Sequence, residues 1–199
     1  MINVLVFPCG SEIGLEVHNA LKYDKHINLV GLSSVSSHGR VVYKNYIEGI
    51  SFITSDTFME ELNKIIEDNN IDVLIPAYDD VILYLSEHRD ELKCKLATSN
   101  KTTCDIARSK RKTYEVLQGE WYIPETFKVS QITEKDLPLF AKPDIGQGSQ
   151  GIMQIEKMED LNLLKGKDDE YIISELLPGQ EYTVDCFTNR KGELVVASM

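Results

Sequence analysis

The sequence predicts an α/β domain with a parallel sheet, followed by an α+β domain with a mainly antiparallel sheet. Over the first hundred residues, apolar strand-like runs alternate with helical patterns, which is typical of a parallel sheet with crossover helices. From residue 126 onward, short strand-like runs dominate and one helix is expected. The 199 residues are 42% hydrophobic and 27% charged, which is the balance of a folded globular protein.

Apolar periodicity and turn residues define the elements of the first domain. The run INVLVF at 2–7 is the first strand, and apolar residues recur at helical spacing over 13–21. Asp56 is expected to cap a helix that ends before Asn69. The other strands are expected at 28–33, 41–43, 71–76 and 94–97.

Parallel strands present ligand-binding groups at their carboxyl ends. The turns after Phe7, Ser33 and Pro76 are therefore expected to share one edge of the sheet. Four side chains could line this edge, namely Ser11, Glu12, Asp79 and Asp80. The turn GSEIG lacks the GxGxxG spacing and carries Glu12 where a pyrophosphate would approach, so a tight strand-to-helix turn is favoured over an NAD site.

The second half begins with a helical segment and continues with short strands. Residues 99–119 are expected to form one continuous helical segment that ends at Gly119. The expected elements after it are one helix at 157–164 and strands at 126–129, 139–142, 152–156, 171–174, 182–187 and 194–197.

Three segments carry residues that suit a nucleotide. RSKRK at 108–112 places four cations in five residues of a chain with net charge −11, which suits a polyphosphate or forms a solvated helix face. In FAKPDIGQGSQG, Lys142 precedes a glycine loop that could cover phosphates with backbone N–H groups or be a plain hairpin. The connector 176–179 offers backbone groups and apolar walls to an adenine, and Glu181 could accept from ribose hydroxyls. A turn and an alternating strand are the alternative there.

In this order, the segments SKRKTYEVL, FAKPDIGQGSQGI and SELLPGQEYTVDCF resemble the ATP-grasp superfamily, especially members similar to the carbamoyl-phosphate synthase large subunit and carboxylate–amine ligases. The resemblance covers 100–199 with motifs, whereas 1–97 is similar only in pattern to the Rossmann-like pre-ATP-grasp domain. It implies domains at 1–99 and 100–199. The second is an incomplete ATP-grasp domain, with a lid subdomain at about 125–174 and the start of a core sheet at 175–199.

The resemblance implies roles for single residues that agree with the chemistry above. Lys110 falls on a basic phosphate contact, Lys142 on the phosphate-reaching lysine of the KP step, and Glu181 on the ribose acceptor. The flexible lid over the phosphates matches Gly146, Gly148, Ser149 and Gly151. The hinge that receives adenine matches Glu175, Leu176 and Leu177. No residue is assigned a catalytic role.

The resemblance also implies a reaction. Members of the family use ATP and Mg²⁺ to activate a small-molecule carboxylate as an acyl phosphate for attack by an amine or a related nucleophile. The family's metal ligands lie on later strands, and this chain stops in the apolar run GELVVASM at Met199. The chain is therefore expected to be an inactive amino-terminal portion, unless another chain supplies the missing half. Carbamoyl-phosphate synthase-type activity stays open, although no internal repeat is seen.

Composition and charge limit which binding partners and which cellular compartment are expected. The net charge, 21 minus 32, disfavours nucleic acid and anionic membranes, and no apolar run approaches the length of a membrane helix. The scattered cysteines and histidines form no zinc spacing and indicate reduced thiols, so a cytoplasmic protein is expected. A homodimer is left open.

Two other function classes compete with the ligase. A non-catalytic nucleotide-binding or assembly module would bind ATP without turnover, whereas a ligase would release ADP and phosphate with the right carboxylate and amine. A Rossmann-type oxidoreductase depends on the first sheet alone, and tight NADH binding would favour it.

Overall fold

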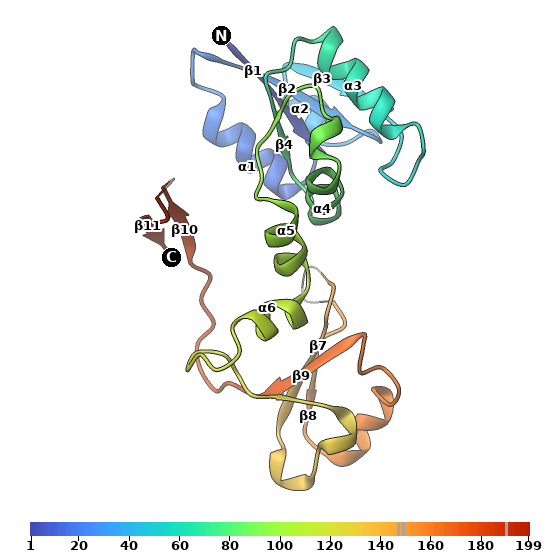
Figure 1. Ribbon diagram of the computed structural model, residues 1–199, viewed down its shortest axis with the longest axis vertical. Coiled ribbons are helices and arrows are strands. Elements are labelled where there is room, and N and C mark those ends of the chain that lie inside the picture. Colours follow the sequence, from blue (N-terminus) through green and yellow to red (C-terminus); the bar gives the residue numbers. More distant parts are fainter. Residues whose placement is uncertain (147, 149, 190) are drawn as a thin grey trace. The chain divides into compact units, whose positions relative to one another are not determined.

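The computed structural model describes residues 1–146, 148, 150–189 and 191–199. Within them the chain divides into two compact units, Met1–Val116 and Leu117–Met199. The first is an α/β unit and the second an α+β unit (Figure 1). The predicted fold class is confirmed, while the domain boundary after residue 99 stays a prediction.

The first unit is built on a parallel sheet of order β3-β2-β1-β4-β5. Its described strands are β1 (Ile2–Phe7), β2 (Ile27–Ser33), β3 (Asn45–Glu48), β4 (Val73–Pro76) and β5 (Lys95–Leu96). β1 is central, because Leu5 pairs with Val30 of β2 on one side and with Leu74 of β4 on the other. All four neighbouring pairs are parallel, so the carboxyl ends of the strands share one edge as predicted.

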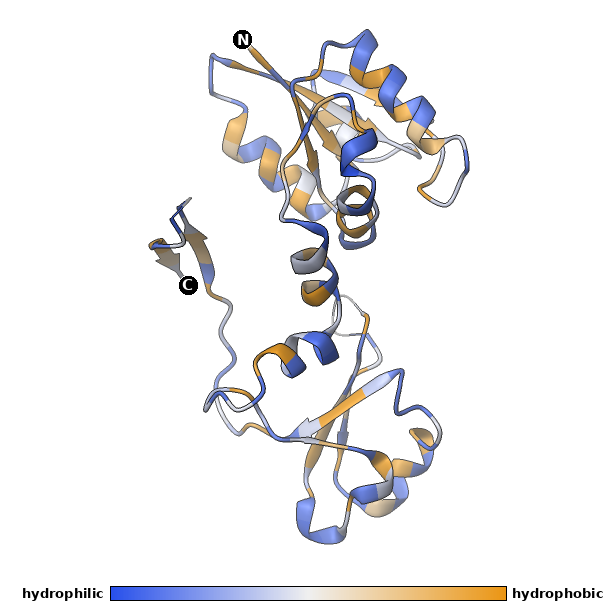
Figure 2. Ribbon diagram, in the orientation of Figure 1, coloured by the Kyte–Doolittle hydropathy of each residue, from blue (hydrophilic) through white to orange (hydrophobic). Residues whose placement is uncertain are grey.

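Four helices cover the two faces of this sheet: α1 (Glu12–Leu21) and α2 (Gly39–Val42) lie on one face, and α3 (Phe58–Asp68) and α4 (Asp79–Glu87) on the other. The 3₁₀ turn η1 (Arg89–Glu91) and the helices α5 (Lys101–Arg108) and α6 (Lys110–Val116) follow in the chain. Along α3, Phe58, Leu62 and Ile66 recur every fourth residue and are all buried, and Figure 2 shows the alternation of apolar and polar residues. This spacing keeps one face of the helix on the core.

The alternation of side chains along β1 divides the core of this unit into two layers. Leu5 and Phe7 face a large cluster that includes Phe58 of α3 and Leu85 of α4. The intervening residues Val4 and Val6 face a smaller cluster, which contains Cys9, Tyr43 and Ala77. Since successive side chains of a strand point to opposite faces, this sheet is apolar on both sides.

Several predicted elements of this unit need correction. Residues 41–43 were expected as a strand, but Gly39–Val42 form the short helix α2, closed by a hydrogen bond from Tyr43 N to Gly39 O. Burial of the Tyr43 ring against the sheet outweighs the β propensity of the two valines. The N-cap of α3 is Thr57 instead of Asp56. β3 and α4 are further elements that sequence reasoning did not identify.

Gly14 lies where α1 touches the turn before it. An added Cβ would lie 2.7 Å from Pro8 O and 2.8 Å from Cys9 O. Gly14→Ala is therefore expected to reduce the free energy of unfolding by about 1–3 kcal/mol through overpacking, although alanine favours a helix by about 1 kcal/mol over glycine. Urea denaturation followed by circular dichroism measures the change. Glu16→Ala, at an exposed position of the same helix, is the matched control, and equal stability of the two variants would contradict the prediction.

The Cys9 thiol is buried in the smaller core layer. Burial raises the pKa of the Cys9 thiol to about 11, whereas Cys186 on the second unit is exposed. Only the thiolate alkylates readily, so iodoacetamide at about pH 8 is expected to modify Cys186 quickly and Cys9 only after unfolding. Timed labelling with peptide mass spectrometry measures both rates, and similar rates in the folded protein would count against the burial of Cys9.

The second unit contains an antiparallel sheet of order β6-β9-β7-β8 and a separate β10–β11 hairpin. The strands are β6 (Thr126–Phe127), β7 (Leu139–Pro143), β8 (Met153–Ile155), β9 (Tyr171–Glu175), β10 (Asp185–Thr188) and β11 (Leu194–Ser198). The 3₁₀ helices are η2 (Val129–Gln131), η3 (Glu134–Asp136) and η4 (Met158–Leu163). The antiparallel sheet was predicted correctly.

One face of the four-stranded sheet packs on its own core. Leu139 and Ala141 of β7, Ile155 of β8 and Ile173 of β9 form this core with Leu161 of η4. The helix predicted at 157–164 is 3₁₀ rather than α, because its six residues only need to bring Leu161 onto the sheet before the chain turns back. The strand predicted at 182–187 begins only at Asp185.

Candidate functional site

Arg108, the first cation of the RSKRK cluster, is held by two carboxylates of the same unit. Its Nε and Nη2 atoms donate to Asp80 Oδ1 at 2.9 and 2.7 Å. Its Nη1 atom lies 3.8 Å from Asp79 Oδ2, and the Arg108 side chain is only 12% exposed. The two aspartates that were expected to line the ligand edge are therefore engaged with the basic cluster.

The segment that carries the basic cluster is bent at Ser109. Its backbone is extended, with φ −108° and ψ 121°, so the single helix predicted over 99–119 is divided into α5 and α6. Ser109 Oγ accepts a hydrogen bond from Lys112 N at 3.1 Å, in the manner of an N-cap. Thr113 Oγ1 lies 2.9 Å from both Ile106 O and Ser109 O, so it links the two helices.

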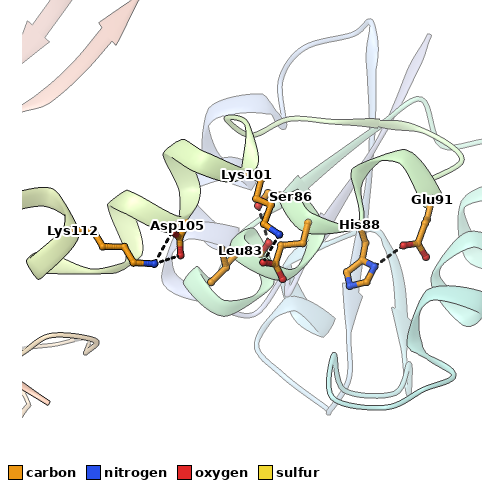
Figure 3. A network of polar contacts seen from close by, with 8 residues as sticks. Leu83, Ser86, His88, Glu91, Lys101, Asp105 and Lys112 are labelled. Atoms are coloured by element: carbon orange, nitrogen blue, oxygen red, sulfur yellow. Dashed lines mark hydrogen bonds and ion pairs between the residues drawn. The ribbon is translucent and has the colours of Figure 1, made fainter. Parts of the chain in front are cut away.

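A second ion pair crosses the same bend. Lys112 Nζ donates to the two carboxylate oxygens of Asp105 at 2.7 and 2.6 Å (Figure 3). Lys110, the predicted phosphate contact, is the first residue of α6 and is half-buried. Two of the four cations, Arg108 and Lys112, thus form ion pairs with nearby carboxylates, and Lys110 is the first residue of a helix that Ser109 caps.

Lys142 lies on β7, in the middle of the four-stranded sheet. Leu139 and Ala141 face the core, so the period of two places Lys142 on the opposite face. In the register of the sheet, Lys142 is paired with Ile172 of β9, which is buried. The lysine is half-buried. Because β7 lies between β9 and β8, Lys142 is held on a rigid strand rather than on a loop.

The glycine loop connects β7 to β8, so it is a hairpin connection built on the strand that carries Lys142. Gly148 and Gly151 have positive φ values of 59° and 74°, which other L-residues rarely adopt. An added Cβ on Gly151 would lie 2.9 Å from Pro143 Cγ and 3.3 Å from Tyr171 Oη. Gly146 is exposed, and Ser149 lies outside the described residues. The loop therefore needs glycine for its conformation at two positions and for close packing at its base.

The predicted hinge follows β9. Glu175 N donates to Glu125 O at 3.0 Å, and Glu175 Oε1 accepts from Glu125 N at 2.9 Å. Leu176 is half-buried, whereas Leu177 is 62% exposed and Glu181 is exposed. The Glu175 carboxylate is thus engaged by the chain entering β6, while an apolar and an acidic side chain beyond it face outward.

At the carboxyl edge of the parallel sheet, Ser11 connects the turn after β1 with the turn after β4. Ser11 Oγ lies 2.9 Å from Pro8 O and 2.7 Å from Ala77 O, and it accepts from Gly14 N. Beside this edge, a pocket of about 200 Å³ lies between α4 and α5, lined by Asp79, Ile82, Thr98, Ser99, Thr103, Cys104, Ala107 and Arg108. Sequence reasoning placed Ser11 at this edge but missed its bridging role and the Asp80–Arg108 pair.

Two negative findings apply to the described residues, which omit 147, 149 and 190. No group of three or more His, Cys, Asp or Glu side chains in them is arranged to hold a metal ion. No described helix combines the length and the apolar character that a membrane crossing requires.

A known protein family matches the second half of the chain, whereas similar solved structures cover most of it. Residues 107–198 match the model of a family described as an ATP-grasp domain. No curated protein matches the chain. The similar solved structures are longer, and the chain spans about half the length of those described next.

Three solved structures illustrate the shared fold. N5-carboxyaminoimidazole ribonucleotide synthetase from Thermotoga maritima is 17% identical with a TM-score of 0.63, covering 98% of this chain and 51% of that one. The L-amino acid ligase from Bacillus licheniformis is 12% identical with a TM-score of 0.69 and the same coverage. The biotin carboxylase domain of Hydrogenobacter thermophilus 2-oxoglutarate carboxylase, a dimer with MgADP, ADP and bicarbonate, is 16% identical with a TM-score of 0.60, covering 88% of this chain and 44% of that one. At these identities the likeness shows the fold.

Proposed function

We propose that the protein containing this chain is an ATP-dependent ligase of the ATP-grasp type, because residues 107–198 match the ATP-grasp domain family. In the proposed reaction, a carboxylate oxygen attacks the γ-phosphorus of ATP and ADP leaves. An amine or a related nucleophile then attacks the acyl carbon, and phosphate leaves. Splitting the reaction in this way replaces a poor leaving group with a good one.

The observation that carries this proposal is the register of β7 and β9. Lys142 is paired with Ile172, and Leu139 with Glu175, so the glycine loop follows one end of this strand pair and the predicted hinge follows the other. Lys142 lies three residues along the strand from Leu139, which is about 10 Å at about 3.3 Å per residue. An extended nucleotide needs such a separation, because its base and its outer phosphates lie at opposite ends. In this proposal, two neighbouring strands would carry both binding regions on one rigid support.

The roles proposed for the side chains follow from their chemistry. Lys142 and the backbone N–H groups of Gly146, Gly148 and Gly151 would neutralise the β- and γ-phosphates, and the absence of a side chain at Gly148 and Gly151 would allow a close approach. The backbone of 175–177 would receive the adenine edge against Leu177, and Glu181 would accept from the ribose. Lys110 is proposed as a further phosphate contact.

Mg²⁺ accompanies ADP in the Hydrogenobacter structure. The described residues of this chain do not offer a cluster of metal ligands, so they do not fit the role of a protein-bound metal site. We therefore assign no reaction step to a metal and propose that residues outside this chain bind it. The chain alone is proposed to be inactive in ligation.

The proposal is tested with the complete protein that contains this chain. Release of ADP and phosphate is screened against pairs of carboxylates and amines, and a carboxylate labelled with ¹⁸O is then used with the active pair. A ligase of the proposed type transfers one labelled oxygen to phosphate. Binding of ATP without turnover for any pair would instead support a non-catalytic nucleotide-binding module, and phosphate release with bicarbonate and ammonia would support carbamoyl-phosphate synthase-type activity.

A further inference from the structure

We propose that the Asp80–Arg108 ion pair positions Lys110 for contact with a nucleotide phosphate, so that Asp80 influences the affinity for ATP. Asp80 and Arg108 are positioning residues here, because they act through Lys110 and are not proposed to touch the nucleotide. The inference rests on the proposed function, since it needs Lys110 to contact a phosphate. Asp80, Arg108 and Lys110 all lie in Met1–Val116, so the contacts that link them are within one unit.

The ion pair is anchored on a rigid element. Asp80 lies in the first turn of α4, directly after β4, and α4 inserts Val81 and Leu85 into the main core. Two guanidinium nitrogens of Arg108 converge on one carboxylate oxygen of Asp80, at 2.9 and 2.7 Å. Arg108 is the last residue of α5, so the pair fixes the end of that helix on the sheet unit.

Only one residue separates this anchor from Lys110. That residue, Ser109, is 5% exposed, and its Oγ caps the entry to α6 by accepting from Lys112 N. Thr113 connects the carbonyl of Ser109 with that of Ile106, and Lys112 pairs with Asp105 across the bend. Once Asp80 binds Arg108, these contacts restrict the backbone conformation of the bend. The position of Arg108 therefore determines the direction in which α6 starts.

This arrangement explains why a negative group lies beside a predicted anion-binding cluster. In a chain of net charge −11, a further carboxylate near the cluster weakens the attraction for phosphate. Asp80 and Asp79 are nevertheless placed against Arg108, whose side chain is mostly buried. A buried guanidinium needs partners, and holding it organises the residues that follow. The role assigned to Arg108 is thus support of the bend rather than direct attraction of the ligand.

A purely electrostatic role and a positioning role of Asp80 predict opposite changes in ATP affinity when Asp80 is replaced. If Asp80 influenced ATP only through its charge, Asp80→Asn would strengthen binding of the anionic nucleotide. If Asp80 positions Lys110 through Arg108, the same substitution is expected to weaken binding about fivefold. Titration calorimetry of the complete protein with a non-hydrolysable ATP analogue measures Kd. Tighter or unchanged binding in Asp80→Asn would overturn the proposal.

A double-mutant cycle tests whether the effect passes through Lys110. Lys110→Ala is expected to weaken binding about tenfold, and adding Asp80→Asn to it is expected to cause no further loss. Two independent effects would instead multiply to about fiftyfold and would overturn the proposal. If Asp80→Asn does not fold, Arg108→Lys replaces it in the cycle, since lysine keeps the charge but loses the two-nitrogen contact.

The controls separate this inference from the proposed function. Lys101→Ala removes another α4–α5 ion pair, the one between Lys101 and Glu87 at 3.2 Å (Figure 3 labels Lys101), and it is expected to leave Kd unchanged. If Lys110→Ala and Lys142→Ala both leave Kd unchanged, the proposed nucleotide site fails. If they weaken binding and Asp80→Asn does not, only the positioning role fails.

Discussion

Replacing Lys142 with alanine is expected to weaken ATP binding by at least about tenfold. The lysine is half-buried on β7, directly before the glycine loop, so its charge is held on a strand instead of moving freely in solvent. A charge-assisted contact of this kind is worth about 1.5–3 kcal/mol, and about 1.4 kcal/mol corresponds to a factor of ten. Titration calorimetry on the complete protein gives the affinity for ATP. The turnover assay gives KM once the substrates are found.

Two further variants make this prediction specific. Lys165→Ala removes an exposed lysine from the same unit and is expected to leave the affinity unchanged, which excludes an effect of overall charge. Lys142→Arg keeps the charge and should retain most of the binding. An affinity for ATP that is the same in Lys142→Ala and in Lys165→Ala would remove Lys142 from the proposed site.

Replacing Phe58 with alanine is expected to destabilise the first unit by about 3–5 kcal/mol, the range for a fully buried aromatic side chain. Phe58 has no exposed surface, and its ring lies 5.6 Å from the rings of Phe7 and Tyr84, centroid to centroid. It therefore joins the sheet to α3 and α4. Removing it leaves a cavity between three elements that cannot all move inward together.

Hydrogen exchange resolved by peptide measures this effect in each unit separately. Amide protection is expected to fall throughout β1 and β4, and to persist in β7 and β9, because the second unit has its own core. Phe52→Ala is the matched control, since that phenylalanine is 61% exposed. A loss of protection no larger than in the control would contradict the role of Phe58.

Strand identity was largely predictable because burial and periodicity agree in this chain. INVLVF became β1 without adjustment, and the edge shared by the turns after Phe7 and Pro76 followed from the parallel register. Elements whose conformation depends on distant contacts were not predictable. The valines of α2 favour a strand, but burial of the Tyr43 ring determines the backbone conformation at these residues. Nothing in the neighbouring sequence indicates that this ring is buried.

The residues of the candidate site were predictable only in part. The positions of Lys142 and of the glycines follow from motif chemistry, and the structure adds the register that links them to Glu175. The role of Arg108 was hidden, because a cation in a basic cluster carries no sign that a carboxylate 28 residues earlier holds it. An isolated serine between two helical runs was the one available signal of the bend at Ser109.

The central place of β1 governs how the first unit can assemble while the protein is being synthesised. β1 can pair with β2 as soon as α1 has formed, but its other edge stays open until β4 has been made. During that interval an apolar strand edge is exposed to other nascent chains. The antiparallel strands of the second unit have no such delay between β7 and β8, because a single hairpin connects them. Chaperones that bind exposed strand edges of nascent chains are therefore expected to act on the first unit and to release it once β4 has paired with β1.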